Sequence, residues 1–136
     1  MDGLIRLGLA AAIAVSLLAA IAAARYLYRR RLRSYFGASA EDLALRFGLA
    51  AGEPAILYFS GSRCVQCRAL QEPALERLAQ QVRVAVRKID AAREPEIARR
   101  FHILSVPATV VLDARHRIRG VNVGFADEQQ LLEQLA

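Results

Sequence analysis

The chain has 136 residues, of which 55% are hydrophobic and 24% charged, and its formal net charge is +6. This length leaves room in the chain for one small domain with an appendage. The charge is uneven: residues 1–36 carry six arginines against one acid, whereas residues 37–136 carry thirteen basic and twelve acidic groups. The basic character belongs to the N-terminal segment, so it does not indicate a nucleic-acid partner.

An apolar run near the N-terminus predicts a membrane-spanning helix. Leu7–Ala24 contains eighteen uncharged residues, of which only Ser16 is polar, and this is close to the minimum length for crossing a bilayer. Leu4-Ile5 extends the run at one end. Tyr26–Tyr28 extends it at the other, with aromatic side chains where the membrane interface would lie. We therefore expect residues 4–28 to contact the lipid bilayer.

A cleaved secretory signal peptide is the alternative for this segment, because Ala22–Ala24 would be an acceptable cleavage site. The run at Leu7–Ala24 is longer than a typical signal-peptide core, which favours an uncleaved anchor. The sequence thus divides into a transmembrane helix with an arginine-rich flank, residues 1–36, and a second domain, residues 37–136.

Two arguments disagree about the side of the membrane on which the C-terminal domain lies. Five arginines follow the span, at positions 25, 29, 30, 31 and 33, whereas only Arg6 and the amino terminus precede it, beside Asp2. The positive-inside rule then places the C-terminal domain in the cytoplasm. Disulfide chemistry, however, is more common in exported proteins. We follow the charges and expect a single-pass protein with a cytoplasmic domain, the alternative being export.

Residues 37–136 alternate between helical and strand patterns. After a break at Gly37-Ala38-Ser39, the expected elements are a short helix capped by Ser39 and ending near Phe47, a strand Ala55–Phe59, a helix from Cys64 to about Gln81 kinked at Pro73, a strand Val82–Ile89, a helix Glu94–Phe101, a hairpin of strands Ala108–Leu112 and Arg117–Val123, and a helix Glu128–Leu135 capped by Asp127. This order predicts an α/β fold with a mixed sheet.

The motif Cys64-Val65-Gln66-Cys67 holds the only two cysteines of the chain. It follows an apolar strand and opens a helix, where unpaired backbone N–H groups and the helix dipole stabilise a thiolate on the first cysteine. The second cysteine, one turn inside, can attack a mixed disulfide held by the first. This placement indicates redox chemistry. A zinc site normally needs four ligands, so two cysteines argue against one within this chain.

With the motif on this order of elements, the chain resembles the thioredoxin family from about Ala55 to the C-terminus. The resemblance rests on five features: the strand Ile56–Phe59, the C-x-x-C at Cys64 and Cys67, the strand ending Lys88-Ile89-Asp90, the run Ser105-Val106-Pro107-Ala108-Thr109, and Gly124 before the last helix. It implies a thioredoxin-like fold after the N-terminal transmembrane helix. It also implies a cis Pro107 against the disulfide, with the backbone of Val106 pairing with the bound substrate chain.

Several positions depart from the family pattern. Arg63 stands where the family often has Trp, and Val65-Gln66 replaces the common Gly-Pro. Tyr58 stands where thioredoxins bury an Asp, and Val86 matches the lysine that often pairs with it. The usual proton acceptor for the second cysteine is therefore expected to be missing, which argues against fast general thioredoxin activity.

Arg63 and Arg68 bracket the motif, and cations near a thiolate favour it. We expect the pKa of the Cys64 thiol to fall from about 8.5 toward roughly 6–7.5, with Arg63 as the main tuning residue. The sequence contains no phosphate-binding glycine loop and no paired-carboxylate pattern. We therefore expect neither a cofactor nor a metal.

The sequence thus predicts a membrane-tethered thiol–disulfide oxidoreductase with Cys64 and Cys67 as catalytic residues and Val106 and Pro107 as substrate-binding residues. Its expected partners are protein disulfides or dithiols, an unidentified electron donor and the bilayer. Two alternatives remain open: a redox-sensing or binding module with poor turnover, and handling of a soft ion such as Cu(I) by the C-x-x-C.

Overall fold

The computed structural model describes residues 1–35 and 39–136, apart from the side chains of Arg29 and of residues 32–35. Residue contacts divide the chain into two units, Met1–Tyr35 and Phe36–Ala136. The break predicted at Gly37-Ala38 lies outside the described residues.

The first unit is one helix, α1 (Asp2–Tyr35), rich in alanine and leucine and without proline. Every side chain described in it is exposed. By length and composition, Asp2–Tyr28 could cross a membrane, and a signal sequence near the N-terminus would pass the same test. The helix thus has the length predicted from the apolar run together with its flanks.

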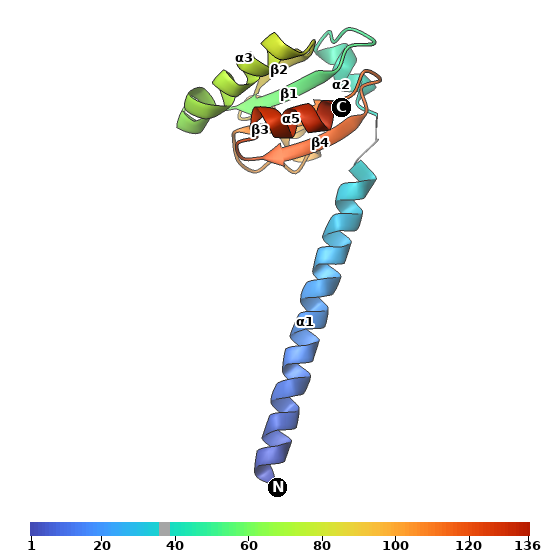
Figure 1. Ribbon diagram of the computed structural model, residues 1–136, viewed down its shortest axis with the longest axis vertical. Coiled ribbons are helices and arrows are strands. Elements are labelled where there is room, and N and C mark those ends of the chain that lie inside the picture. The colour runs from blue at the N-terminus through green and yellow to red at the C-terminus, as the bar shows by residue number, and fades with distance from the viewer. Residues whose placement is uncertain (36–38) are drawn as a thin grey trace. The chain divides into compact units, whose positions relative to one another are not determined.

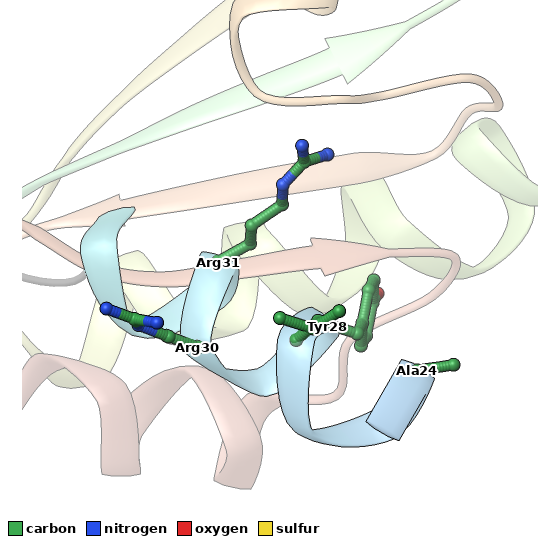
Figure 2. Close-up of a pocket in the computed structure, with 5 residues that line it drawn as sticks. Ala24, Tyr28, Arg30 and Arg31 are labelled. Carbon is green, nitrogen blue, oxygen red and sulfur yellow. The ribbon is translucent and has the colours of Figure 1, made fainter. Parts of the chain in front are cut away.

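Near the C-terminal end of α1 lies a surface hollow lined by Ala24, Leu27, Tyr28, Arg30 and Arg31. Figure 2 shows Arg30 and Arg31 extending from the helix in different directions, with Tyr28 and Ala24 on the preceding turns. This is the apolar-to-basic transition expected where a helix leaves a bilayer.

The second unit contains a four-stranded sheet in the order β2-β1-β3-β4 (Figure 1). Its strands are β1 (Ala55–Ser60), β2 (Ala85–Asp90), β3 (Ala108–Leu112) and β4 (Ile118–Val123). β1 pairs in parallel with β2 and antiparallel with β3, which forms an antiparallel hairpin with β4. The predicted mixed sheet is confirmed.

Helices cover both faces of the sheet. They are α2 (Glu41–Arg46), α3 (Glu72–Gln81), α4 (Pro95–Arg100) and α5 (Glu128–Leu135). On one face, side chains of α3 and α5 pack with Ile56, Tyr58 and Val111. On the other, side chains of α2 and α4 pack with Leu57 and Phe59. Because both faces are covered, every residue of β1 is buried.

Several element boundaries differ from the sequence prediction, and backbone hydrogen bonds explain two of the differences. The second strand begins at Ala85 rather than Val82, because the N–H of Val82 donates to the carbonyl of Leu78 and so ends the preceding helix. Ser39 does not cap the short helix in the expected way. Ala40 is the N-cap residue of α2, while the Ser39 hydroxyl accepts a bond from the Glu41 N–H.

A π-helical turn, η1 (Cys67–Gln71), joins the motif to α3, just before Pro73. In this turn the N–H of Glu72 donates to the carbonyl of Cys67, five residues back. Such a bond brings residues five apart onto the same face, as residues four apart lie in an α-helix. Glu72 therefore follows Cys67 on the side of the helix that faces the sheet.

Candidate active site

The two cysteines form a disulfide between Cys64 and Cys67 at the start of the helix that follows β1. Cys67 is fully buried, whereas Cys64 is partly exposed. The N–H of Cys67 lies 3.1 Å from Cys64 Sγ and donates to it. After reduction, the same N–H and the positive end of the helix would stabilise a thiolate at Cys64, the sulfur that a substrate can reach.

The Val106–Pro107 peptide bond is cis, as the resemblance implied. Pro107 is buried, and Val106 packs in the same cluster as Cys64 and Cys67. Within the described residues, neither backbone polar group of Val106 has a hydrogen-bond partner inside the chain. An extended peptide lying across the disulfide could pair with these groups by adding to the sheet.

Gly61 fits closely beside Val106. A Cβ atom at Gly61 would lie 3.3 Å from Val106 Cγ2, closer than most such contacts. The carbonyl of Gly61 also accepts a bond from the N–H of Cys64 at 3.2 Å. The absence of a side chain at Gly61 thus lets the turn before the motif approach the cis-proline segment.

Beneath the motif, Tyr58 is buried and its hydroxyl donates to Glu72 Oε1 at 3.2 Å. Lys88 Nζ donates to the same oxygen at 2.6 Å and lies 6.0 Å from the centre of the Tyr58 ring. The side chains come from β1, α3 and β2. Tyr58 also packs in the cluster that contains Cys67. Tyr58 thus occupies the strand position at which the usual proton acceptor was expected to be missing, and Glu72 supplies a carboxylate to its hydroxyl from the helix.

The surroundings shift the pKa of both acidic groups in this trio. The hydrogen bond from Lys88 is the main cause that lowers the pKa of Glu72, with smaller help from Tyr58 and the charge of Arg68. Burial raises the pKa of Tyr58, and the charge of Glu72 raises it further. Near neutral pH the trio therefore holds a carboxylate, an ammonium and a neutral phenol.

Gln71 fixes the helix to the segment before α5. Its fully buried side chain donates to the carbonyl of Ala126 and accepts from the N–H of Ala126, both at 3.0 Å. Close by in sequence, the N–H of Gly124, which has a positive φ, donates to the carbonyl of Pro107 at 2.8 Å. These bonds join three segments around the disulfide: the helix, the cis-proline segment and the turn before α5.

Both arginines that bracket the motif are exposed. Arg68 Nη1 reaches back to the carbonyl of Ser62 at 3.0 Å, which holds its guanidinium beside the turn that carries Cys64. Among the described residues, no carboxylate forms an ion pair with Arg63 or Arg68. The motif is thus flanked by two positive charges, of which that of Arg68 also acts on Glu72 without forming an ion pair with it.

The thioredoxin family model matches residues 47–136, which include the disulfide, the cis-proline and the whole sheet. The chain belongs to the thioredoxin family. A curated relative, the bifunctional thioredoxin reductase/thioredoxin of Mycobacterium leprae, is 28% identical over 90 residues, which cover 65% of this chain and 19% of that protein. The chain thus spans about a fifth of that relative's length.

Solved thioredoxin structures are also similar to this chain. A mutant thioredoxin from Halobacterium salinarum is 30% identical, with a TM-score of 0.55 over 62% of this chain and 73% of that one. A reduced Schistosoma mansoni thioredoxin pre-protein shares the fold at 18% identity, with a TM-score of 0.59 over 69% of this chain and 90% of that one. Family membership and the paired cysteines support thiol–disulfide oxidoreductase chemistry.

Three residues of this site escaped the sequence analysis as functional candidates: Gln71, Glu72 and Lys88. A polar residue at each of two consecutive helix positions, flanked by apolar ones, was the available signal for Gln71 and Glu72. Within the described part of the chain, no group of three or more His, Cys, Asp and Glu side chains could hold a metal ion.

Proposed function

We propose that this protein is a membrane-tethered thiol–disulfide oxidoreductase in which Cys64 is the nucleophile and Cys67 the resolving cysteine. The observation that carries the proposal is the disulfide at a helix start, with its first cysteine partly exposed and its second fully buried. This asymmetry suits a mechanism in which only one sulfur meets the substrate.

In the reductive direction, the Cys64 thiolate attacks one sulfur of a substrate disulfide. A mixed disulfide forms and the other substrate sulfur leaves as a thiolate, which takes up a proton. Cys67 then loses its proton and attacks Cys64 Sγ. The Cys64–Cys67 disulfide forms and the second substrate thiol is released. The dithiol has given two electrons and two protons to the substrate, and an external dithiol donor must restore it.

The remaining roles follow from the contacts around the disulfide. Val106 would pair through its backbone with the substrate chain, since it packs in the cluster that contains both cysteines, and the cis Pro107 that follows it would shape the groove. Arg63 would favour the Cys64 thiolate through its charge. The substrates would be protein disulfides or dithiols. The contacts around the disulfide do not indicate a class of electron donor.

The N-terminal segment would serve as the anchor. Residues 4–28 would lie in the bilayer, residues 1–36 would form the transmembrane helix with its arginine flank, and residues 37–136 the redox domain. We place that domain in the cytoplasm because arginines dominate the C-terminal flank of the span. There the pair would rest mostly as a dithiol.

Substrate trapping tests this function. The full-length Cys67→Ala variant lacks the resolving thiol, so it should accumulate mixed disulfides on Cys64 that a small dithiol releases. A Cys64→Ala variant is the matched control and should trap nothing. The wild type should also catalyse reduction of insulin disulfides. A reactive Cys64 that traps no partner and reduces no insulin would contradict the proposal, and Cu(I) bound to the purified reduced protein would then favour metal handling.

A further inference from the structure

A hollow lined mostly by polar and charged residues lies beside the turn that carries Cys64. It has a volume of about 360 Å³ and is lined by Ser60, Gly61, Ser62, Arg68, Lys88 and Asp90. Two of these residues, Gly61 and Ser62, lie three and two residues before Cys64, and the Cys64 N–H donates to the Gly61 carbonyl. A group held in this hollow would therefore sit next to a substrate sulfur that reacts with Cys64.

The hollow opens where two parallel strands end. Ser60 and Asp90 are register partners at the carboxyl ends of β1 and β2. Ligands of α/β sheets commonly bind outside these strand ends. The hollow offers two hydroxyl groups and two cationic side chains to such a ligand.

The charges of the hollow favour an anion. The Asp90 carboxylate is occupied by its own turn: it accepts from the N–H groups of Ala92 and Arg93 and lies 3.8 Å from the guanidinium of Arg93. Lys88 is paired with Glu72. Arg68 has only the Ser62 carbonyl as a hydrogen-bond partner among the described residues, so most of its five N–H donors can reach a ligand.

We propose that this hollow binds the carboxylate of an acidic residue that neighbours the reacting cysteine in a protein disulfide substrate. The inference rests on the proposed function and names its substrate class: disulfides with an acidic neighbour. Arg68 donates to the carboxylate in charge-assisted hydrogen bonds, and the hydroxyls of Ser60 and Ser62 complete the site. Arg63, on the same turn, steers acidic substrates toward it.

The test uses three disulfide-bonded peptides that differ only in the residue after one cysteine, which is Glu, Gln or Lys. The reduced full-length protein, in neutral detergent, should react with the Glu peptide about two- to fivefold faster than with the Gln peptide, and slowest with the Lys peptide. Raising the salt concentration from about 0.02 M to about 0.5 M should reduce this preference. Oxidised glutathione is a fourth substrate, because it carries carboxylates without a protein chain.

Arg68→Gln should bring the Glu-to-Gln rate ratio close to one. The matched control is Arg87→Gln, which removes the same charge from the strand position next to Lys88, on the opposite face of β2, and should keep the ratio. An effect of Arg68 on the Cys64 thiolate would change the rates with the Glu and Gln peptides equally. The ratio of the two rates therefore reports only the binding of the carboxylate. A wild-type ratio of one, or a ratio that Arg68→Gln leaves intact, would overturn the proposal.

A binding measurement separates this proposal from the proposed function. Linear Glu and Gln peptides with serine in place of cysteine are titrated against the same variants. If no disulfide is reduced but Arg68 still confers a preference for the Glu peptide, the oxidoreductase function fails and the carboxylate site stands. If disulfides are reduced without any preference for the Glu peptide, the oxidoreductase function stands and the carboxylate site fails. An Arg68-dependent reaction with glutathione alone would also overturn the assignment to protein substrates.

Discussion

The hydroxyl of Tyr58 donates a 3.2 Å hydrogen bond to the carboxylate of Glu72, which lies five residues after Cys67 and accepts a second bond from Lys88. A tyrosine thus occupies the strand position at which thioredoxins bury an acid, and the acid enters from the helix instead. The carboxylate is paired with a cation rather than isolated, which keeps it ionised near neutral pH. This relationship changes what substitutions at the site are expected to do.

Replacing Tyr58 with Asp should destabilise the domain by at least about 2 kcal/mol, because a buried carboxylate replaces a packed aromatic ring. The new carboxylate would also lie near that of Glu72, and like charges raise each other's pKa. The double variant Tyr58→Asp/Glu72→Gln should recover part of the loss in urea unfolding at neutral pH. In folded variants, resolution of a mixed disulfide by Cys67 should be faster than in the wild type, since Asp could accept its proton. An unchanged resolution rate would show that Tyr58 does not limit this step.

Replacing Tyr58 with Phe should change how stability depends on alkaline pH. Burial raises the pKa of Tyr58 in the folded state, so its contribution is complete below the unfolded tyrosine pKa of about 10 and is lost as the pH rises through the folded value. The wild type should therefore lose stability relative to Tyr58→Phe above about pH 10. Urea unfolding of both proteins across this range measures the difference. Tyr26→Phe, in α1, serves as the control, and parallel pH profiles of wild type and Tyr58→Phe would contradict the prediction.

Replacing Gln71 with Leu should destabilise the domain by about 2–4 kcal/mol, because both the N–H and the carbonyl of Ala126 would lose their buried partner. Gln80→Leu, at an exposed position of α3, should change stability by less than about 0.5 kcal/mol. Urea unfolding of the three proteins measures both effects. Similar stability of the two variants would mean that the buried amide does not fix the segment before α5.

Alkylation of the reduced protein near neutral pH should label Cys64 far faster than Cys67. Cys64 is partly exposed and its sulfur accepts a backbone N–H, whereas Cys67 is fully buried. Mass spectrometry after short exposure to iodoacetamide measures the two rates, with each single Cys→Ala variant as a reference. Faster labelling of Cys67 would reverse the roles proposed for the two cysteines.

Fusions to the C-terminus should reveal a cytoplasmic domain. A fluorescent protein that folds only in the cytoplasm should be active, and a phosphatase that is active only after export should not. Replacing the arginines at 25, 29, 30, 31 and 33 with Gln should move the domain outward, because Lys and Arg near the span control insertion. Phosphatase activity with the natural arginines would place the domain outside, and identical results for both sequences would mean that these charges do not set orientation.

The elements of the fold could be predicted from the sequence because apolar patterning and turn residues agree along most of the domain. The hairpin and the Asp127 cap match the structure, as does the cis Pro107 that the family resemblance implied. The trio around Glu72 could not be predicted, because a regular helix would turn Glu72 away from the face of Cys67 and only the π-helical turn restores it. A comparison with the family position by position also misses Glu72, because its carboxylate comes from the helix rather than from β1. The predicted start of β2 lies too early because Val82 and Val84 have strand propensity, whereas the backbone N–H of Val82 bonds to the end of α3.

The strand order β2-β1-β3-β4 leaves β2 and β4 as the two edges of the sheet. Each edge carries an exposed arginine, Arg87 on β2 and Arg119 on β4. An edge strand can recruit a strand from another molecule, and charged side chains oppose this pairing. Two copies that approach edge to edge would bring like charges together, so neighbouring molecules can crowd without their sheets merging into larger assemblies.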